Sequence, residues 1–368
     1  MRWHHRYDKL PFEISLFTAS KTKLWCFELD SVVDLRSDTV TKPSIGMRQA
    51  MLNADVGDDV YGEDPTAAAL EEKAAELLKT ESALFVTSGT QSNLLALLSH
   101  CQRGDEYIAG SQAHSYLEEG GGGAVLASIQ PQPIENRHDG TIDLNKVEAA
   151  IKPDDFHYAT TRLFCLENTF YGQPLPITYL EEAATLARHH GLSFHLDGAR
   201  LFNAAIKQNT PAHEISQHFD SISACLSKGL GAPMGSVLCG TRKFIQDARR
   251  WRKMLGGGWR QAGIVASAGL YALEHNIERL VDDHENALLL SRLLEEIDGL
   301  AIDKPKERTN MVFVTVPEVI VPELTPRLRQ AGILITCESN PVRLVTHLDI
   351  DKPAIYRSVE AFRHALSH

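Results

Sequence analysis

The sequence lacks a long hydrophobic run and an excess of positive charge, and each absence excludes a class of protein. Over 368 positions, 37 Lys and Arg residues are outnumbered by 48 Asp and Glu residues, which gives a formal net charge of -11. An acidic chain repels phosphate backbones and anionic lipids unless a local basic patch overcomes that repulsion, and the longest basic run is RRWRK at residues 249–253. The most apolar stretch, residues 263–273, is far shorter than the roughly 18–20 residues that span a bilayer. We therefore expect neither nucleic acid nor a membrane as a partner.

Cysteine pairs and common metal-binding spacings are also missing. The six cysteines show no CxxC spacing, and several lie in apolar runs such as LFCL at residues 163–166. This favours reduced, buried thiols in a cytoplasmic protein. The 16 histidines include close pairs but no HExxH sequence, so no metal site is expected.

Residues 1–32 differ in composition from the rest of the chain. They hold six of the 26 aromatic side chains and follow no helical or strand period. A signal peptide needs a continuous apolar segment, and the longest one here, residues 14–17, is too short. We expect an N-terminal extension, which is either a flexible leader or a product of start-codon choice.

From residue 33 onward, short apolar strands alternate with helices. Strands are predicted at residues 83–87, 162–166, 192–196 and 222–226, and helices at residues 94–101 and 180–190. A further helix starts at Pro65, with Asp64 as its N-cap. The alternation predicts an α/β fold with a mostly parallel sheet and helices on both faces.

The pattern changes toward the C-terminus. Strands at residues 311–316, 332–336 and 343–347 are separated by one helical segment, which predicts a smaller α+β domain. The expected domains are therefore residues 33–275, the large one, and residues 276–368, the small one.

Three features stand at the ends of predicted strands, where open α/β sheets bind their ligands. The segment SGTQSN at residues 88–93 is either a helix N-cap or a phosphate-binding turn, since amide groups at a helix start attract anions. Asp197 in HLDGAR and Lys228 in LSKGLG each follow a strand. Singly, they are a turn-forming acid and a surface lysine. Together they favour a pyridoxal 5'-phosphate (PLP) site, where a lysine bonds the cofactor and a carboxylate holds the pyridine nitrogen protonated.

A nicotinamide cofactor is the other phosphate-bearing ligand that the glycines around Gly231 suggest. No GxGxxG sequence opens a helix early in the predicted domain, and the glycine-rich loop follows a lysine instead. A dinucleotide-binding fold is therefore not expected.

Seven segments from residue 34 onward follow one another in a recognisable series. They are DLRSDTVTKP (34–43), DDVYGEDP (58–65), TSGTQSN (87–93), SFHLDGAR (193–200), CLSKGLGAPMGS (225–236), WRKMLGGGWRQAG (251–263) and RLVTHLD (343–349). In this order they resemble the low-specificity L-threonine aldolases, which belong to the β-eliminating lyase group of fold-type I PLP enzymes. The resemblance implies a large domain with a mostly parallel seven-stranded sheet and a smaller C-terminal α+β domain. It leaves residues 1–32 unmatched.

The resemblance also implies roles for single positions. Lys228 matches the lysine that bonds PLP, Asp197 the partner of the pyridine nitrogen, and His114 the imidazole that stacks on the cofactor near the substrate hydroxyl. Gly89 and Thr90 match residues that bind the cofactor phosphate. Ser37, Arg200 and Arg343 match residues that bind the substrate carboxylate, and Arg200 also lies beside the cofactor in the family. Lys253 and Arg260 match residues that reach the cofactor of a neighbouring subunit. Shared active sites imply an oligomer, expected to be a homotetramer.

The activity implied is retro-aldol cleavage of L-threonine or L-allo-threonine to glycine and acetaldehyde, as part of threonine breakdown and glycine formation. A base must take the β-hydroxyl proton, and imidazole titrates near neutral pH. His114 and His157 are the candidates, acting directly or through a water molecule. His157, in DDFHYA, is equally well explained as a structural residue.

Four positions depart from the family pattern. Phe170 and Tyr171 follow ENT where His-Asn is common, Trp259 replaces a common methionine, and Glu118 stands at a usually apolar place. These departures leave open a preference for larger β-hydroxy amino acids such as phenylserine, or a β-elimination instead. A homologue without catalysis is a further alternative, against which the intact lysine, aspartate, histidine and two arginines argue.

Overall fold

The computed structural model describes residues 32–303 and 308–367. The chain divides into two units after Val32, and the fold described below is that of the second unit. All but the last residue of the predicted N-terminal extension, residues 1–32, lies outside the described residues.

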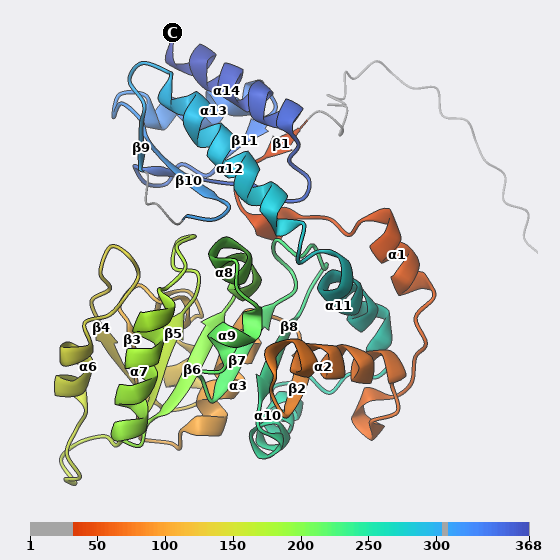
Figure 1. The fold of residues 1–368 in the computed structure, drawn as a ribbon, viewed down its shortest axis with the longest axis vertical. Coiled ribbons are helices and arrows are strands. Elements are labelled where there is room, and N and C mark those ends of the chain that lie inside the picture. Colours follow the sequence, from red (N-terminus) through yellow and green to blue (C-terminus); the bar gives the residue numbers. More distant parts are fainter. Residues whose placement is uncertain (1–31, 304–307, 368) are drawn as a thin grey trace, which may run out of the picture. The chain divides into compact units, whose positions relative to one another are not determined.

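A seven-stranded sheet carries the large part of this second unit (Figure 1). Its order is β2-β8-β7-β6-β5-β3-β4, and within this sheet β8 runs antiparallel to both neighbours while the other pairs are parallel. The strands are β2 (Ser82–Val86), β3 (Glu106–Gly110), β4 (Gln130–Ile134), β5 (Thr161–Glu167), β6 (Ser193–Gly198), β7 (Ser221–Cys225) and β8 (Ser236–Gly240). The predicted α/β class with a mostly parallel seven-stranded sheet is confirmed, and the four predicted strands correspond to β2, β5, β6 and β7.

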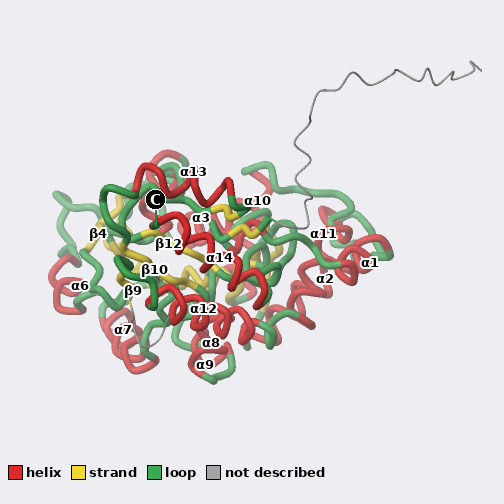
Figure 2. The backbone as a smooth tube through the Cα atoms, turned by 90° about the horizontal axis from the view of Figure 1, so that it is seen from above, coloured by secondary structure: helices red, strands yellow, loops and turns green. Residues whose placement is uncertain are grey.

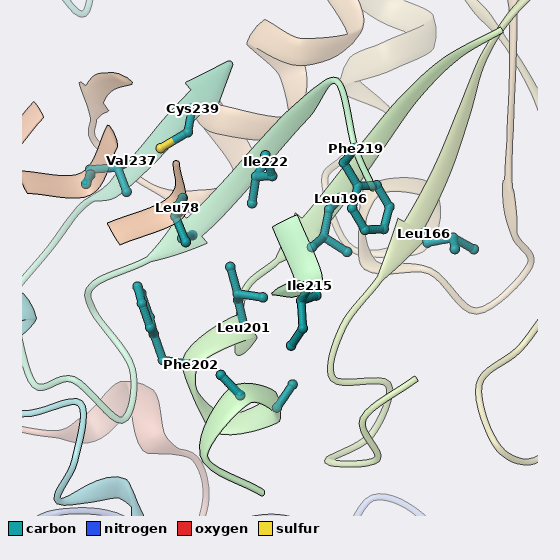
Figure 3. Packing of buried hydrophobic residues seen from close by; sticks show 14 of the residues in the cluster. Leu78, Leu166, Leu196, Leu201, Phe202, Ile215, Phe219, Ile222, Val237 and Cys239 are labelled. Carbon is teal, nitrogen blue, oxygen red and sulfur yellow. The ribbon is translucent and has the colours of Figure 1, made fainter. Parts of the chain in front are cut away.

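Helices cover both faces of the sheet because successive side chains of a strand point to opposite faces. On one face, Phe85, Leu196 and Ile222 belong to a core with side chains of α2, α7, α8, α9 and α11; Figure 3 shows part of it, with strand residues facing Leu201 and Phe202. On the opposite face, Leu84 and other alternate residues pack with side chains of α3 and α10. Figure 2 shows the red helices around the yellow strands.

The helices of the large part vary from short turns to three or four full turns. They are α1 (Ile45–Leu52), α2 (Pro65–Leu78), α3 (Gly89–His100), α4 (His114–Leu117), α5 (Gly122–Val125), α6 (Leu144–Ala150), α7 (Ile177–His189), α8 (Leu201–Gln208), α9 (Ala212–Ser216), α10 (Arg242–Met254) and α11 (Gly263–His275), with 3-10 helices η2 (Asp38–Val40) and η3 (Asp59–Tyr61). Within the described residues, no helix combines the length and the apolar character needed to cross a membrane.

The helix starts test the cap predictions directly. Asp64 caps α2 as expected, because its Oδ1 accepts a hydrogen bond from the Ala67 amide at 2.8 Å and Pro65 is the first helical residue. The segment 88–93 is corrected in part: it is not a turn followed by a helix at residue 94. The helix α3 already begins at Gly89, since Ser88 caps it and the side chains of Ser92 and Asn93 are buried.

The C-terminal part holds two small sheets and three helices. One sheet has the order β12-β10-β9 and is antiparallel, and in the other β1 pairs in parallel with β11. The elements are β1 (Val33–Asp34), β9 (Ala301–Asp303), β10 (Met311–Thr315), β11 (Ile333–Leu334), β12 (Val342–Val345), α12 (Leu280–Glu295), α13 (Val321–Gln330) and α14 (Lys352–Leu366). They share one apolar core.

The predicted boundary between residues 275 and 276 stays a prediction, but the start of the large domain needs a correction. Val33 and Leu35 are buried in the C-terminal core together with Leu290 and Val314. Their side chains alternate with Asp34, so both apolar ones face that core. The first residues after position 32 therefore belong structurally with the C-terminal part.

Candidate active site

Two strand ends bring the predicted cofactor residues to one edge of the sheet. Since β5, β6 and β7 are parallel, their carboxyl ends lie together. Asp197 stands near the end of β6, opposite Glu167 of β5, and Lys228 follows the end of β7. Lys228 lies within electrostatic range of Glu167, Asp38 and His114.

The side chain of Lys228 is partly buried. Its backbone carbonyl accepts a hydrogen bond from Thr41 Oγ1 at 3.0 Å, but in the described part of the chain its ammonium group has no hydrogen-bond partner. A partly buried lysine without a partner is available for bonding to a ligand.

The start of α3 lies beside β7. The Ser88 hydroxyl accepts a hydrogen bond from the Gln91 amide at 3.1 Å, whereas the amides of Gly89 and Thr90 have no helical acceptor and lie at the positive end of the helix dipole. A Cβ atom on Gly89 would stand only 2.8 Å from Cys225 Sγ, so the helix and strand approach too closely there for a side chain. The segment 88–93 therefore starts with a helix N-cap, and its free amides suit an anion. The two interpretations, an N-cap and a phosphate-binding turn, are compatible.

Asn93 links Asp197 to a second carboxylate. Its Nδ2 donates to Asp197 Oδ2 and to Glu119 Oε1, both at 2.8 Å, and the Ala199 amide donates to Asp197 Oδ1 at 3.1 Å. Sequence reasoning assigned no role to Asn93 or Glu119. The signal for Asn93 was its place in TSGTQSN, seven positions before the helix end at His100, but only the fold shows which face of α3 it occupies.

His114 is oriented by the same cluster. Its Nδ1 lies 2.9 Å from Glu119 Oε1, and ligand-type atoms of His114, Glu119 and Asp197 all lie within 4.8 Å of one another. The hydrogen bond to Glu119 raises the pKa of His114, although burial opposes it. A carboxylate only accepts, so Nδ1 carries the hydrogen and Nε2 is the free nitrogen of the neutral ring. The predicted histidine therefore has the form of a base.

Glu167 is a further acid at this edge that sequence reasoning missed. Its Oε2 accepts a hydrogen bond from the His114 amide at 2.8 Å. Burial, followed by the charge of Asp197, raises the pKa of Glu167 to about 7. The available signal was an acid at the end of a buried strand, in the ENT sequence that the pattern analysis used only to mark a departure.

Arg200 and Arg343 lie near each other, but their surroundings differ. Arg200 donates from Nε and Nη2 to the buried carboxylate of Asp38, at 2.8 and 2.6 Å. Arg343 is half-buried, and burial, followed by the charge of Arg200, lowers its pKa. Within the described residues, the only hydrogen bond of its guanidinium is a long one of 3.5 Å to the carbonyl of Arg36.

These surroundings refine the predicted carboxylate site. Asp38 already occupies two of the donors of Arg200, so Arg343 is the guanidinium left to receive an anion. Asp38 itself escaped the sequence analysis, since a partner 162 positions away leaves no mark in local spacing. Ser37 caps η2 by accepting a hydrogen bond from the Thr39 amide, next to Asp38.

His157 does not lie at this edge within its own chain, and its prediction as a base stays a prediction. It precedes the amino end of β5, whereas Glu167 and Asp197 lie at carboxyl ends, and a seven-residue strand spans roughly 20 Å. Its side chain is 66% exposed, and its Nδ1 lies 2.6 Å from Asp155 Oδ1. Of the two interpretations of His157, the structural one fits this loop.

The residues predicted to reach a neighbouring subunit lie on the surface. Lys253 is exposed in the last turn of α10. Arg260 is also exposed, and its Nη1 donates to Asp58 Oδ2 at 2.9 Å. Trp259, between them, packs edge-on against Phe85 with ring centres 5.0 Å apart.

The other departures separate into buried and exposed positions. Phe170 is buried, whereas Tyr171 is 41% exposed. Burial, followed by the charges of Glu167 and Glu118, raises the pKa of Tyr171, which places its phenol beside the site. The Tyr171 ring meets Phe313 in a T-shaped contact at 6.1 Å.

Known proteins resemble this chain in sequence and in fold. Residues 34–317 match the family described as "Beta-eliminating lyase". The chain is 53% identical over 321 residues, 87% of this chain and 95% of the relative, to the "Low specificity L-threonine aldolase" of Escherichia coli (strain K12). The solved structure of Leishmania major threonine aldolase shares the fold, with a TM-score of 0.76 and 20% identity over 90% of this chain and 99% of that one. A structure described as "SPT with PLP" also shares it, with a TM-score of 0.71 and 15% identity over 91% of this chain and 87% of that one. The chain belongs to the beta-eliminating lyase family and, within it, to the low-specificity L-threonine aldolases.

Proposed function

We propose that this chain is a PLP-dependent aldehyde-lyase that cleaves L-threonine and L-allo-threonine to glycine and acetaldehyde. The observation that carries the proposal is the placement of Lys228 and Asp197 at adjoining strand ends, close to a half-buried Arg343 that has no carboxylate partner among the described residues. A carbon–carbon lyase fits the family to which the chain belongs.

The residues at this edge fit PLP. Besides the unpartnered ammonium of Lys228 and the amides of Gly89 and Thr90, the Oγ of Ser223 is buried without a hydrogen-bond partner, and Ser223 lies opposite Asp197 in the register of β6 and β7. We assign Lys228 to the covalent bond with the cofactor, Asp197 to its ring nitrogen, and Gly89 and Thr90 to its phosphate. When bound, the protonated pyridine ring accepts the electron pair released as the Cα–Cβ bond breaks.

Arg343 binds the substrate carboxylate in this proposal. Guanidinium groups pair with carboxylates through two parallel hydrogen bonds, and burial, followed by the charge of Arg200, lowers the pKa of Arg343, so a bound carboxylate would stabilise its charged form. Arg200 adds positive charge beside it while Asp38 fixes its orientation. Ser37 completes the predicted carboxylate contacts.

His114 removes the proton of the β-hydroxyl group. Its Nδ1 is held by Glu119, so Nε2 is the atom that accepts the proton. As the ring becomes charged, the adjacent Glu119 and Asp197 stabilise it. The proton is then available for return to the product.

The exposed ring of Tyr171 supports a second candidate substrate. It lies within electrostatic range of Glu167 and Arg343 and so offers an aromatic surface near the proposed carboxylate site. Aromatic rings pack favourably on one another, so phenylserine is the alternative substrate that this side chain favours.

The test is an assay of glycine and aldehyde release from L-threonine, L-allo-threonine and phenylserine, with protein reconstituted with PLP. We expect activity and a visible absorbance band in the wild type, and loss of both in Lys228→Ala. Lys243→Ala is the matched control, because Lys243 is exposed and pairs only with Asp247. A visible band without aldehyde from any substrate would refute the aldolase proposal.

We also infer a homotetramer with active sites shared between subunits, to which Lys253 and Arg260 contribute. Ile45, Leu52 and Tyr61 are exposed by 88%, 77% and 75% in the segment that includes Asp58, the partner of Arg260. Large exposed apolar side chains in one region mark an interface. Light scattering should give four times the chain mass, and a monomer would refute the inference.

A cytoplasmic location belongs to the same proposal. The described cysteines, Cys101, Cys165, Cys225, Cys239 and Cys337, are all free, as expected in a reducing compartment. A fluorescent fusion found in another compartment would contradict this assignment.

A further inference from the structure

The face of the sheet beneath Asp197 carries buried polar side chains where an apolar core would be expected. On β6, Phe194 and Leu196 belong to the apolar core on one face, so His195 and Asp197 point to the opposite face, which α3 covers. On β7, Ser221 lies opposite His195 in the register. His195 is 2% exposed and Ser221 is fully buried.

These side chains form a continuous series of hydrogen bonds with two residues of α3. His100 Nε2 lies 2.7 Å from Ser221 Oγ, and Ser221 Oγ lies 2.8 Å from His195 Nδ1. His195 Nε2 lies 3.2 Å from Asn93 Oδ1, and Asn93 Nδ2 lies 2.8 Å from Asp197 Oδ2. Asn93 and His100 are seven positions apart, hence two turns along the same face of α3.

The direction of every hydrogen bond follows from the two carboxylates at one end. Asp197 and Glu119 only accept, so the Asn93 amide nitrogen faces them and its Oδ1 faces His195. Nε2 of His195 must then carry the hydrogen, which leaves Nδ1 bare to accept from the Ser221 hydroxyl.

The last link follows in the same way. Because the Ser221 hydroxyl hydrogen is used on His195, its oxygen accepts from His100 Nε2. Burial lowers the pKa of His195 to about 3 and that of His100 to about 4, so both rings are neutral at pH 7. Each link thus holds one hydrogen.

All four donors point toward Asp197. Hydrogen bonds in a chain with a common direction polarise one another, and their positive ends stabilise a negative charge at the end of the chain. Since neither imidazole is protonated at pH 7, the series holds no imidazolium that could give a proton to Asp197.

We propose that His195, Ser221 and His100 are positioning residues that act through Asn93 to hold Asp197 as an oriented carboxylate for the ring nitrogen of the bound cofactor. The proposal rests on the proposed function, because that function assigns PLP to this edge. Ser221 has the central role, since its hydroxyl fixes the tautomer of His195. Without it, His195 can place its hydrogen on Nδ1, and Nε2 then no longer donates to Asn93.

The experiment measures the dissociation constant of PLP by titrating the apoprotein and following the visible absorbance of the bound cofactor. Loss of one buried hydrogen bond changes affinity by about five- to tenfold, so we expect that loss of affinity in Ser221→Ala and recovery in Ser221→Thr, which restores the hydroxyl. Ser358→Ala is the matched control, because Ser358 is fully buried on α14 in the C-terminal part and its Oγ donates to the Ala354 carbonyl at 2.8 Å. It should bind PLP as the wild type does.

A second titration separates positioning from folding. The probe is the PLP analogue in which a C–H group replaces the ring nitrogen, so Asp197 has nothing to pair with. We expect Ser221→Ala and the wild type to bind this analogue equally, within about twofold. An equal loss of affinity for both cofactors, or a Ser221→Ala variant that binds PLP as tightly as Ser358→Ala does, would overturn the proposal. Failure of the wild type to bind PLP would instead overturn the proposed function.

Discussion

The guanidinium of Arg200 forms a two-point ion pair with the fully buried carboxylate of Asp38, through Nε and Oδ2 at 2.8 Å and Nη2 and Oδ1 at 2.6 Å. Asn310 Nδ2 also donates to Asp38 Oδ2 at 3.1 Å. Burial alone would raise the pKa of Asp38, but the charge and hydrogen bonds of Arg200 outweigh it and lower the pKa to about 2. The pair thereby joins η2, near the N-terminal strand, to the end of β6 and to the C-terminal part of the chain.

Removal of this carboxylate should destabilise the protein strongly. Asp38→Ala leaves the charge of Arg200 buried and unpaired, so we expect the free energy of unfolding in urea to fall by about 3–5 kcal/mol. Asp247→Ala removes the partner of the exposed Lys243 and should cost less than about 1 kcal/mol. Equal effects of the two substitutions, measured by circular dichroism, would contradict a stabilising role for the buried pair.

Substitution of Glu119 should lower the pKa of His114 and weaken the orientation of its ring. In Glu119→Gln the hydrogen bond that raises the pKa of His114 loses its charge, so the pKa falls. Because His114 must be neutral to act as a base, the acid limb of the kcat/KM profile should move to lower pH. We also expect kcat to decrease by about tenfold, as the weaker orientation removes part of the contribution of a general base.

The neighbouring Glu118 provides the control for that pH profile. Glu118 is exposed and is not among the groups that shift the pKa of His114. Glu118→Gln should therefore leave the acid limb in place. If both substitutions move it equally, the hydrogen bond to Glu119 does not set the pKa of His114.

The fold was predictable where local patterns and tertiary packing agree. The strand β5 carries the apolar run LFCL, and β6 and β7 place an apolar residue at every second position, so these segments were recognised as strands from the sequence. The strand β4 has the sequence QPQPI and was not predicted, because proline normally interrupts a strand. It is tolerated here at the edge of the sheet, where one side needs no hydrogen-bond donors. The pairing of β1 with β11 joins residues about 300 positions apart and has no local signal.

From the residues alone, the site was predictable only where reactive side chains lie at the ends of strands. Asp197 lies near the end of β6 and Lys228 follows the end of β7, and these positions at neighbouring strand ends brought them together in the prediction. The partners that orient them or their neighbours, Asn93, Glu119 and Asp38, come from other elements, and their contacts depend on the helical face or loop path. His157 shows the opposite case: its imidazole is chemically suitable, but within its own chain it precedes the amino end of β5, away from the other site residues.

Tyr171 should affect the choice of substrate more than the reaction itself. We expect Tyr171→Ala to lower kcat/KM for phenylserine relative to L-threonine by about two- to tenfold, which corresponds to the loss of one aromatic contact. Phe156→Ala removes an aromatic ring that is 93% exposed on the loop before β5, and should leave the ratio unchanged. An unchanged ratio in Tyr171→Ala would exclude this ring from the substrate pocket.

The buried imidazole of His284 should make the protein less stable as pH falls. Burial, together with the charges of Lys207 and Arg279, lowers its pKa from 6.5 to about 4. Between those two values the unfolded chain binds a proton that the folded chain does not, so the free energy of unfolding decreases as pH falls from about 7 to 4. His284→Gln removes this titration, and its stability relative to the wild type should improve over that range by about 1–2 kcal/mol. The exposed His275 supplies the control His275→Gln, which should leave the pH dependence of urea unfolding unchanged. Parallel pH profiles for the wild type and His284→Gln would show that His284 is protonated in the folded protein as readily as in the unfolded one.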